Sequence, residues 1–178
     1  GDFQGLPVSA TPGAGRPEPP RDADERTSLE VWLEFHRATL AMKCRGLTGE
    51  QLARRAVPPS GLSLLGLVRH LAELERHYFR RAHAGEEIPW LHCDPAAPEA
   101  WLAFEGAAPG TAAADLAAWR VECDRSREIA AATPSLDEAS ARSGQTLRWT
   151  MVKMIQEYAR HNGHADLLRE CIDGAVGE

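Results

Sequence analysis

The sequence lacks several features that would assign it to a particular class of protein. Its four cysteines lie far apart and form no C-x-x-C pair, which excludes a zinc ribbon and a thioredoxin-type redox site. No apolar run approaches the length of a transmembrane helix, and the first residues resemble no secretory signal. We therefore predict a cytoplasmic protein whose thiols are reduced.

Positive charge is also scarce. The formal net charge is −6, whereas a surface that binds nucleic acid or an anionic membrane needs a basic patch. The pairs Arg54 and Arg55, and Arg80 and Arg81, are short and lie among acidic residues. We predict neither a nucleic-acid partner nor a membrane partner. The length of 178 residues and the hydrophobic content of 43% suit one globular domain with a real core.

Common catalytic motifs and strand-like alternation are absent as well. The chain contains no G-x-S-x-G, no phosphate-binding glycine-rich loop and no H-E-x-x-H. Helical periodicity is present, with apolar residues at steps of three and four. It predicts helices over residues 28–45, 63–84, 111–131 and from 145 or 146 to 172. Ser63 suits an N-cap, and Gly46, Gly85 and Gly174 suit helix ends. The pattern predicts an all-α protein, a four-helix bundle.

The segments outside these helices differ in composition. Residues 1–26 are rich in Pro, Gly and Ala, which predicts an arm that is laid on the surface or poorly structured. The bundle then spans 27–174, and 175–178 form a tail. The connection 86–110 is unusually long and carries Trp90 and Trp101. Two interpretations remain open for this connection: a crossover whose aromatic residues pack on the bundle, or a lid over a pocket.

The candidate site lies on the last predicted helix. Glu157, His161 and His164 share one face of that helix, because successive residues rotate by roughly 100°. His70, on the second predicted helix, can approach the same place from across the bundle. Two imidazoles and one carboxylate form a three-ligand site for a divalent metal, and such a site keeps one coordination position open. This pattern is typical of a catalytic rather than a structural metal site.

Other interpretations of these residues stay open. The histidines can be packing residues of the core, and Glu157 can pair with Arg160 or Arg169 or lie exposed at the edge of the apolar stripe. Gly163, inside the helix, suggests either close helix approach or room for a ligand. His36 is a weaker candidate for a supporting role in the pocket.

The run Ser63-Leu-Leu-Gly-Leu-Val-Arg-His70-Leu-Ala and the later run Glu157-x-x-x-His161-x-Gly-His164-Ala-Asp together resemble the DinB-like superfamily of metal-binding four-helix proteins. The nearest match is its uncharacterised "mini-circle protein" branch, over about residues 28–174. The resemblance implies an up-down-down-up course of the helices. It also implies that His70 and His161 bind zinc or nickel. Glu157 stands where many members have the first histidine of an H-x-x-x-H pair, which is a departure from the family pattern.

The resemblance also implies a function. Some members are S-transferases or isomerases that use a low-molecular-weight thiol such as mycothiol or bacillithiol. We therefore predict a metal-dependent, mycothiol-type S-transferase that acts on a small electrophile. His164, which replaces a glutamine of the family, would be a catalytic group in the pocket or a fourth ligand. The alternatives are a non-catalytic protein that binds a divalent metal or a small ligand, and a metal-free bundle. A homodimer is a further implication, since members often dimerise.

Overall fold

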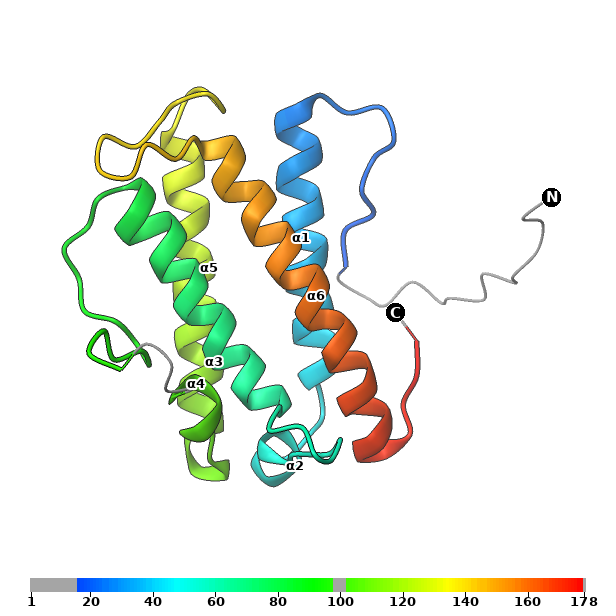
Figure 1. The fold of residues 1–178 in the computed structure, drawn as a ribbon. Helices are drawn as coiled ribbons and strands as arrows, with labels where there is room; N and C mark the ends of the chain where they lie inside the picture. The colour runs from blue at the N-terminus through cyan, green and yellow to red at the C-terminus, as the bar shows by residue number, and fades with distance from the viewer. Residues whose placement is uncertain (1–15, 98–101, 178) are drawn as a thin grey trace.

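The computed structural model describes residues 16–97 and 102–177, and within these ranges its regular secondary structure is helical apart from an isolated bridge between Ala139 and Thr146. Figure 1 shows four long helices side by side. They are α1 (Glu25–Cys44), α3 (Leu64–Glu75), α5 (Ala112–Ala132) and α6 (Leu147–Asp173), and α3 is continued by a π-helical segment, η1 (Arg76–His83). The predicted all-α fold is confirmed.

The helix boundaries follow the capping residues. The Ser63 hydroxyl accepts a hydrogen bond from the Gly66 amide at 3.0 Å, so Ser63 is the predicted N-cap of α3. Gly174 ends α6 in the left-handed conformation, with φ of 77°. The first helix begins earlier than predicted, because Asp24 rather than a later residue caps it by accepting from the Thr27 amide at 2.9 Å.

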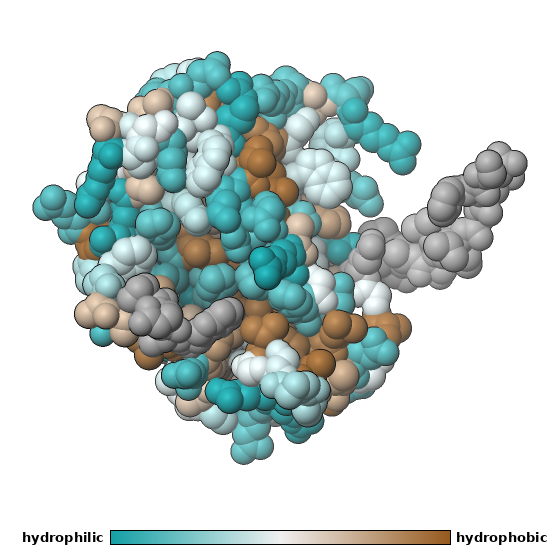
Figure 2. Space-filling view, viewed as in Figure 1, coloured by the Kyte–Doolittle hydropathy of each residue, from teal (hydrophilic) through white to brown (hydrophobic). Residues whose placement is uncertain are grey.

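The four long helices follow the implied up-down-down-up course. In Figure 1, α1 and α6 descend while α3 and α5 rise. Helix α1 packs on α6, and α3 packs on both α5 and α6. The long connection between η1 and α5 returns the chain to the end where α3 began, so α3 and α5 run in parallel. Figure 2 shows this side of the molecule as mostly hydrophilic, with apolar patches between the polar side chains.

Two short helices, α2 (Gly49–Ala53) and α4 (Leu102–Glu105), lie at one end of the bundle and were not predicted. Both are too short to show a helical period. Helix α4 depends on a close contact, since a Cβ added at Gly66 would lie 2.6 Å from the Phe104 ring. Gly66 therefore allows α4 to pack directly on α3.

The first half of the long connection is fastened to the outside of α3 and η1. The buried Glu73 carboxylate accepts hydrogen bonds from the backbone amides of residues 91–93. Trp90 stacks on His77 with ring centroids 5.1 Å apart, and the Arg81 guanidinium lies over its ring. This half is a crossover whose aromatic residue packs on the bundle. Trp101 lies outside the described residues.

The predicted N-terminal arm is described only from Arg16 onward. There the Arg16 guanidinium lies 4.4 Å from the centre of the Phe35 ring, so this part of the arm rests on α1. Among the helices in the described ranges, none combines the length and the apolar character that crossing a bilayer requires.

The core contains a buried polar cluster that joins all four long helices. The Glu75 carboxylate of α3 receives two hydrogen bonds from the Arg37 guanidinium of α1, at 2.8 and 2.7 Å. The Tyr158 hydroxyl of α6 donates to the same carboxylate at 2.8 Å and accepts from the Trp119 indole of α5 at 2.8 Å. The thiol of Cys123 lies 3.6 Å from Glu75. We call these five residues the closed cluster.

Candidate metal centre

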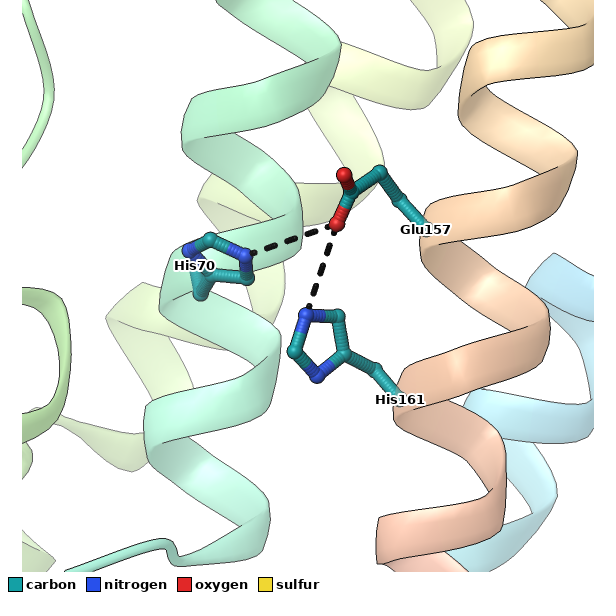
Figure 3. A group of neighbouring side chains, drawn as sticks. All are labelled: His70, Glu157 and His161. Carbon is teal, nitrogen blue, oxygen red and sulfur yellow. Dashed lines mark ion pairs between the residues drawn. The ribbon is translucent and has the colours of Figure 1, made fainter.

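His70, Glu157 and His161 meet between α3 and α6 (Figure 3). We call them the triad. The Nε2 atom of His161 lies 3.5 Å from Glu157 Oε2, and that of His70 lies 4.0 Å from the same oxygen. One candidate ligand atom from each residue falls within 4.8 Å of the others. The structure therefore brings together the three residues predicted from the sequence, and their role as metal ligands stays a prediction.

Helix geometry explains this convergence. Glu157 and His161 are one turn apart on α6, so their side chains point from the same face toward α3. His70 lies on the facing side of α3, at the edge of its apolar stripe. The His70 and His161 ring centroids are 4.7 Å apart. The apolar stripes that pack α3 against α6 thus also set the spacing of the triad.

The protonation states of the triad residues suit the binding of a cation. Burial, followed by the neighbouring His70, lowers the pKa of His161 to about 4, although the Glu157 carboxylate acts in the opposite direction. Burial also lowers the pKa of His70. Burial raises the pKa of Glu157, but the hydrogen bond from Lys153 and the nearby positive charges outweigh it, so this pKa lies below its ordinary value. At neutral pH the triad offers two neutral imidazoles and one carboxylate.

Glu157 has a lysine rather than an arginine as its cationic partner. Lys153, one turn earlier on α6, donates to Glu157 Oε1 at 2.5 Å, while Oε2 faces the imidazoles. The proposed arginine partners are not used: Arg169 pairs with Asp173, and Arg160 has no ion pair within the described ranges. The i, i+4 spacing of Lys153 and Glu157 was the signal that could have identified this pair.

His164 contacts His161 rather than the rest of the triad. The two Nδ1 atoms are 3.2 Å apart, so one of them donates a hydrogen bond to the other. If Nε2 of His161 binds a cation, its Nδ1 carries the hydrogen and donates to His164. This geometry favours a supporting role for His164 in the pocket over that of a fourth ligand.

Two weaker candidates lie elsewhere. The His36 carbonyl accepts a hydrogen bond from Asn162 at 3.0 Å where α1 meets α6, so His36 belongs to a helix contact. A Cβ added at Gly163 would meet none of the described atoms within 4 Å. Close approach of another helix within the described part of the chain therefore does not explain that glycine, and the suggestion of room for a ligand stays a prediction.

A pocket of about 520 Å³ opens beside the triad. We call it the triad pocket. It is lined by residues from the loop before α3, from α4 and from α6: Arg55, Ser60, Gly61, Leu62, Phe104, Glu105, Arg160, His161 and His164. The Phe104 ring lies 5.5 Å from the His70 ring. The second half of the long connection, α4, therefore forms a wall of this pocket, whereas Trp90 packs elsewhere.

The aromatic residues of α6 do not line the triad pocket. Tyr158 points into the closed cluster, and Trp149 packs beside Tyr78 with ring centroids 5.8 Å apart. Cysteine chemistry is also unfavourable in the core, because burial raises the pKa of Cys44 to about 12 and also that of Cys123. The candidate reactive groups at this site are therefore the triad and His164.

These features define a helical bundle with a candidate divalent-metal centre beside a small-molecule pocket. Comparison with known families agrees with this class: the family model described as "MST: Mycothiol-S-transferase" matches residues 28–174. The chain belongs to the mycothiol-S-transferase family, which confirms the resemblance to the DinB-like superfamily. No curated protein matches the chain.

Proposed function

We propose that the protein is a metal-dependent S-transferase that joins mycothiol to a small electrophile. The observation that carries this proposal is the convergence of the triad beside an open pocket. Membership of the mycothiol-S-transferase family supports the choice of thiol. We propose zinc or nickel as the metal, because imidazole nitrogens and a carboxylate oxygen are suitable ligands for these ions.

The donor set fits a divalent cation. Each imidazole can present an Nε2 lone pair, since the pKa values of His70 and His161 lie below their ordinary range. Glu157 contributes a negative charge through Oε2, while Lys153 holds Oε1. A thiol bound to a dication at this position would be held as the thiolate, the nucleophilic form, at neutral pH.

The reaction that we propose is a displacement. For an alkyl halide, the thiolate sulfur forms a bond to carbon, the carbon–halogen bond breaks, and the halide leaves with the electron pair. The thiol proton passes to solvent through the open side of the pocket. His164 lines that pocket, and with Nε2 of His161 on the metal it would accept from His161 through Nδ1, which would leave its Nε2–H to donate a hydrogen bond to the bound thiol or electrophile. We propose this orienting role for it.

The alternatives make different demands on the same residues. A non-catalytic metal-binding protein is best served by a closed sphere of four protein ligands. In the described part of the chain, three residues converge and His164 contacts His161 instead, which favours an open site. A metal-free bundle finds some support in the Lys153–Glu157 pair, but that pair leaves Oε2 of Glu157 facing two uncharged rings.

The test is the conjugation of mycothiol with 1-chloro-2,4-dinitrobenzene, followed by absorbance with zinc-loaded and nickel-loaded protein. We expect metal-dependent turnover that is lost in His161→Ala, with glutathione as the comparison thiol. Turnover that is unchanged in His161→Ala would contradict the proposed role of the triad. A metal-loaded protein that accelerates no thiol with any of a panel of electrophiles would overturn the function.

A further inference from the structure

In the part of the chain that the structure describes, two guanidinium groups border the triad pocket without a carboxylate partner. Arg160 lies on α6, next in sequence to His161, and Arg55 follows α2. Neither forms an ion pair within residues 16–97 and 102–177, whereas the buried Arg37 and the half-buried Arg69 are each paired with a carboxylate. Arg55 and Arg160 are both exposed, so each is free to contact a molecule that enters the pocket.

The charges that face this pocket are mostly positive. Glu105 is its one acidic lining residue in the described part of the chain, and it pairs with neither arginine. A divalent cation at the triad would add to this positive potential. A pocket with such a potential concentrates anions.

The remaining walls suit an apolar body. Leu62 and Phe104 contribute apolar side chains to the same pocket as the two arginines and the triad histidine His161. The volume of about 520 Å³ lies in the range of small-molecule sites. A guanidinium binds a carboxylate through two parallel hydrogen bonds, which fixes the orientation of the bound molecule as well as its position.

We infer that the triad pocket selects electrophiles that carry a carboxylate, which Arg160 and Arg55 bind while the reactive carbon faces the triad. Leu62 and Phe104 contact the apolar body between these two ends. This inference rests on the proposed function, because it names the class of electrophile for the same site. It makes the two arginines specificity-determining residues rather than catalytic ones.

The first test uses two electrophiles that differ in one group: 4-(chloromethyl)benzoate and 4-(chloromethyl)benzamide, each with mycothiol and zinc-loaded protein. We expect kcat/KM for the acid to exceed that for the amide by about tenfold or more. Arg160→Gln should lower this ratio by about tenfold, and Arg55→Gln should also lower it. Arg54→Gln, which removes the same charge from an exposed residue that does not line the pocket, should leave the ratio unchanged.

The second test needs no turnover. Calorimetry measures the binding of unreactive 4-methylbenzoate to the full chain, with and without zinc, because a carboxylate can also bind the metal directly. We expect binding without zinc, weakened about tenfold by Arg160→Gln but not by Arg54→Gln, and no comparable binding of 4-methylbenzamide.

The two tests separate the failure of the inference from that of the function. If neither electrophile is turned over but 4-methylbenzoate binding depends on Arg160, the transferase function fails and the anion site stands. If both electrophiles react equally well and 4-methylbenzoate does not bind, the function stands and the inference is overturned. An equal drop in the acid-to-amide ratio of kcat/KM in Arg54→Gln and Arg160→Gln would also overturn it, because a general charge effect would then explain the result.

Discussion

Glu157 and Tyr158 are neighbours on α6, yet they belong to two clusters that differ in how the charge of the carboxylate is compensated. Tyr158 belongs to the closed cluster, where the Glu75 side chain is 0% exposed and both of its oxygens are hydrogen-bonded. Glu157 belongs to the triad, where its side chain is 14% exposed and Lys153 binds one oxygen. The other oxygen faces two neutral imidazoles.

The difference lies in where the positive charge comes from. In the closed cluster, Arg37 supplies a bidentate cation from within the chain, so the buried carboxylate is compensated. In the triad, Lys153 compensates only from one side, and the side that faces the pocket offers lone pairs to a cation from outside. The first arrangement is satisfied from within the chain, and the second is suited to binding a cation.

The largest effect is expected from breaking the closed cluster. Arg37→Met leaves the Glu75 carboxylate buried without its cation, and such a loss typically costs about 3–5 kcal/mol. We expect the free energy of unfolding, measured by urea denaturation, to fall by about this amount. Arg127→Met, which breaks an exposed pair with Glu34, should cost no more than about 1 kcal/mol. Equal losses in the free energy of unfolding for Arg37→Met and Arg127→Met would contradict the distinction between the closed cluster and an exposed ion pair.

The next effect concerns the triad. Glu157→Gln removes the charged ligand, so we expect zinc affinity to fall by about 100-fold or more, since loss of an outer partner alone typically costs 10–100-fold. Without metal, the free energy of unfolding should change by less than about 1 kcal/mol, because among the described residues Lys153 is the charged partner that Glu157 loses at neutral pH, where its histidine neighbours are neutral. Competition with a chelating dye gives the affinity. Unchanged zinc affinity would show that the carboxylate is not a ligand.

Tyr158→Phe is the matched change one residue along α6. It removes a hydroxyl that donates to Glu75 and accepts from Trp119, which leaves two buried polar groups short of a partner. We expect a loss of about 1–3 kcal/mol in the free energy of unfolding. Zinc affinity should stay at the wild-type value, because the hydroxyl points away from the triad. If Tyr158→Phe loses zinc affinity but no stability, the roles assigned to the closed cluster and the triad would be reversed.

A further expected effect is a pH dependence of the stability of the metal-free protein. His161 has an ordinary pKa of 6.5 when unfolded and a pKa of about 4 when folded, so only the unfolded state binds the proton between these values. Stability is therefore lost as the pH falls from about 6.5 to about 4, and this contribution levels off below that range. In chelator-containing buffers, Tm should fall less steeply in His161→Asn than in the wild type. Parallel curves of Tm against pH for the two proteins would contradict the lowered pKa of His161.

Much of the fold could be predicted because its signals are local. The apolar steps of three and four mark the long helices, and Ser63 and Gly174 mark their ends by chemistry that acts within one turn. The shared face of Glu157 and His161 follows from helical spacing alone. The approach of His70 from α3 depended on the packing of two distant segments, so helical spacing left it a possibility that the family resemblance then supported.

What could not be predicted depends on tertiary contacts. Helix α4 is held by the contact of Phe104 with Gly66, and no local periodicity reports such a contact. The ion pair between Arg37 and Glu75 joins two helices, and the sequence pattern does not predict it either. Arginine partners for Glu157 were plausible by spacing, but Lys153 lies on the same face one turn earlier and donates a hydrogen bond to the carboxylate.

The central claim is that the triad binds a divalent metal, and elemental analysis tests it most directly. Wild-type protein, His161→Ala and Tyr158→Phe would each be incubated with excess zinc or nickel, freed of unbound metal by gel filtration and analysed. We predict about one metal ion per chain in the wild type and in Tyr158→Phe, and almost none in His161→Ala. A wild-type protein that retains no metal, or a His161→Ala variant that retains as much as the wild type, would contradict the account.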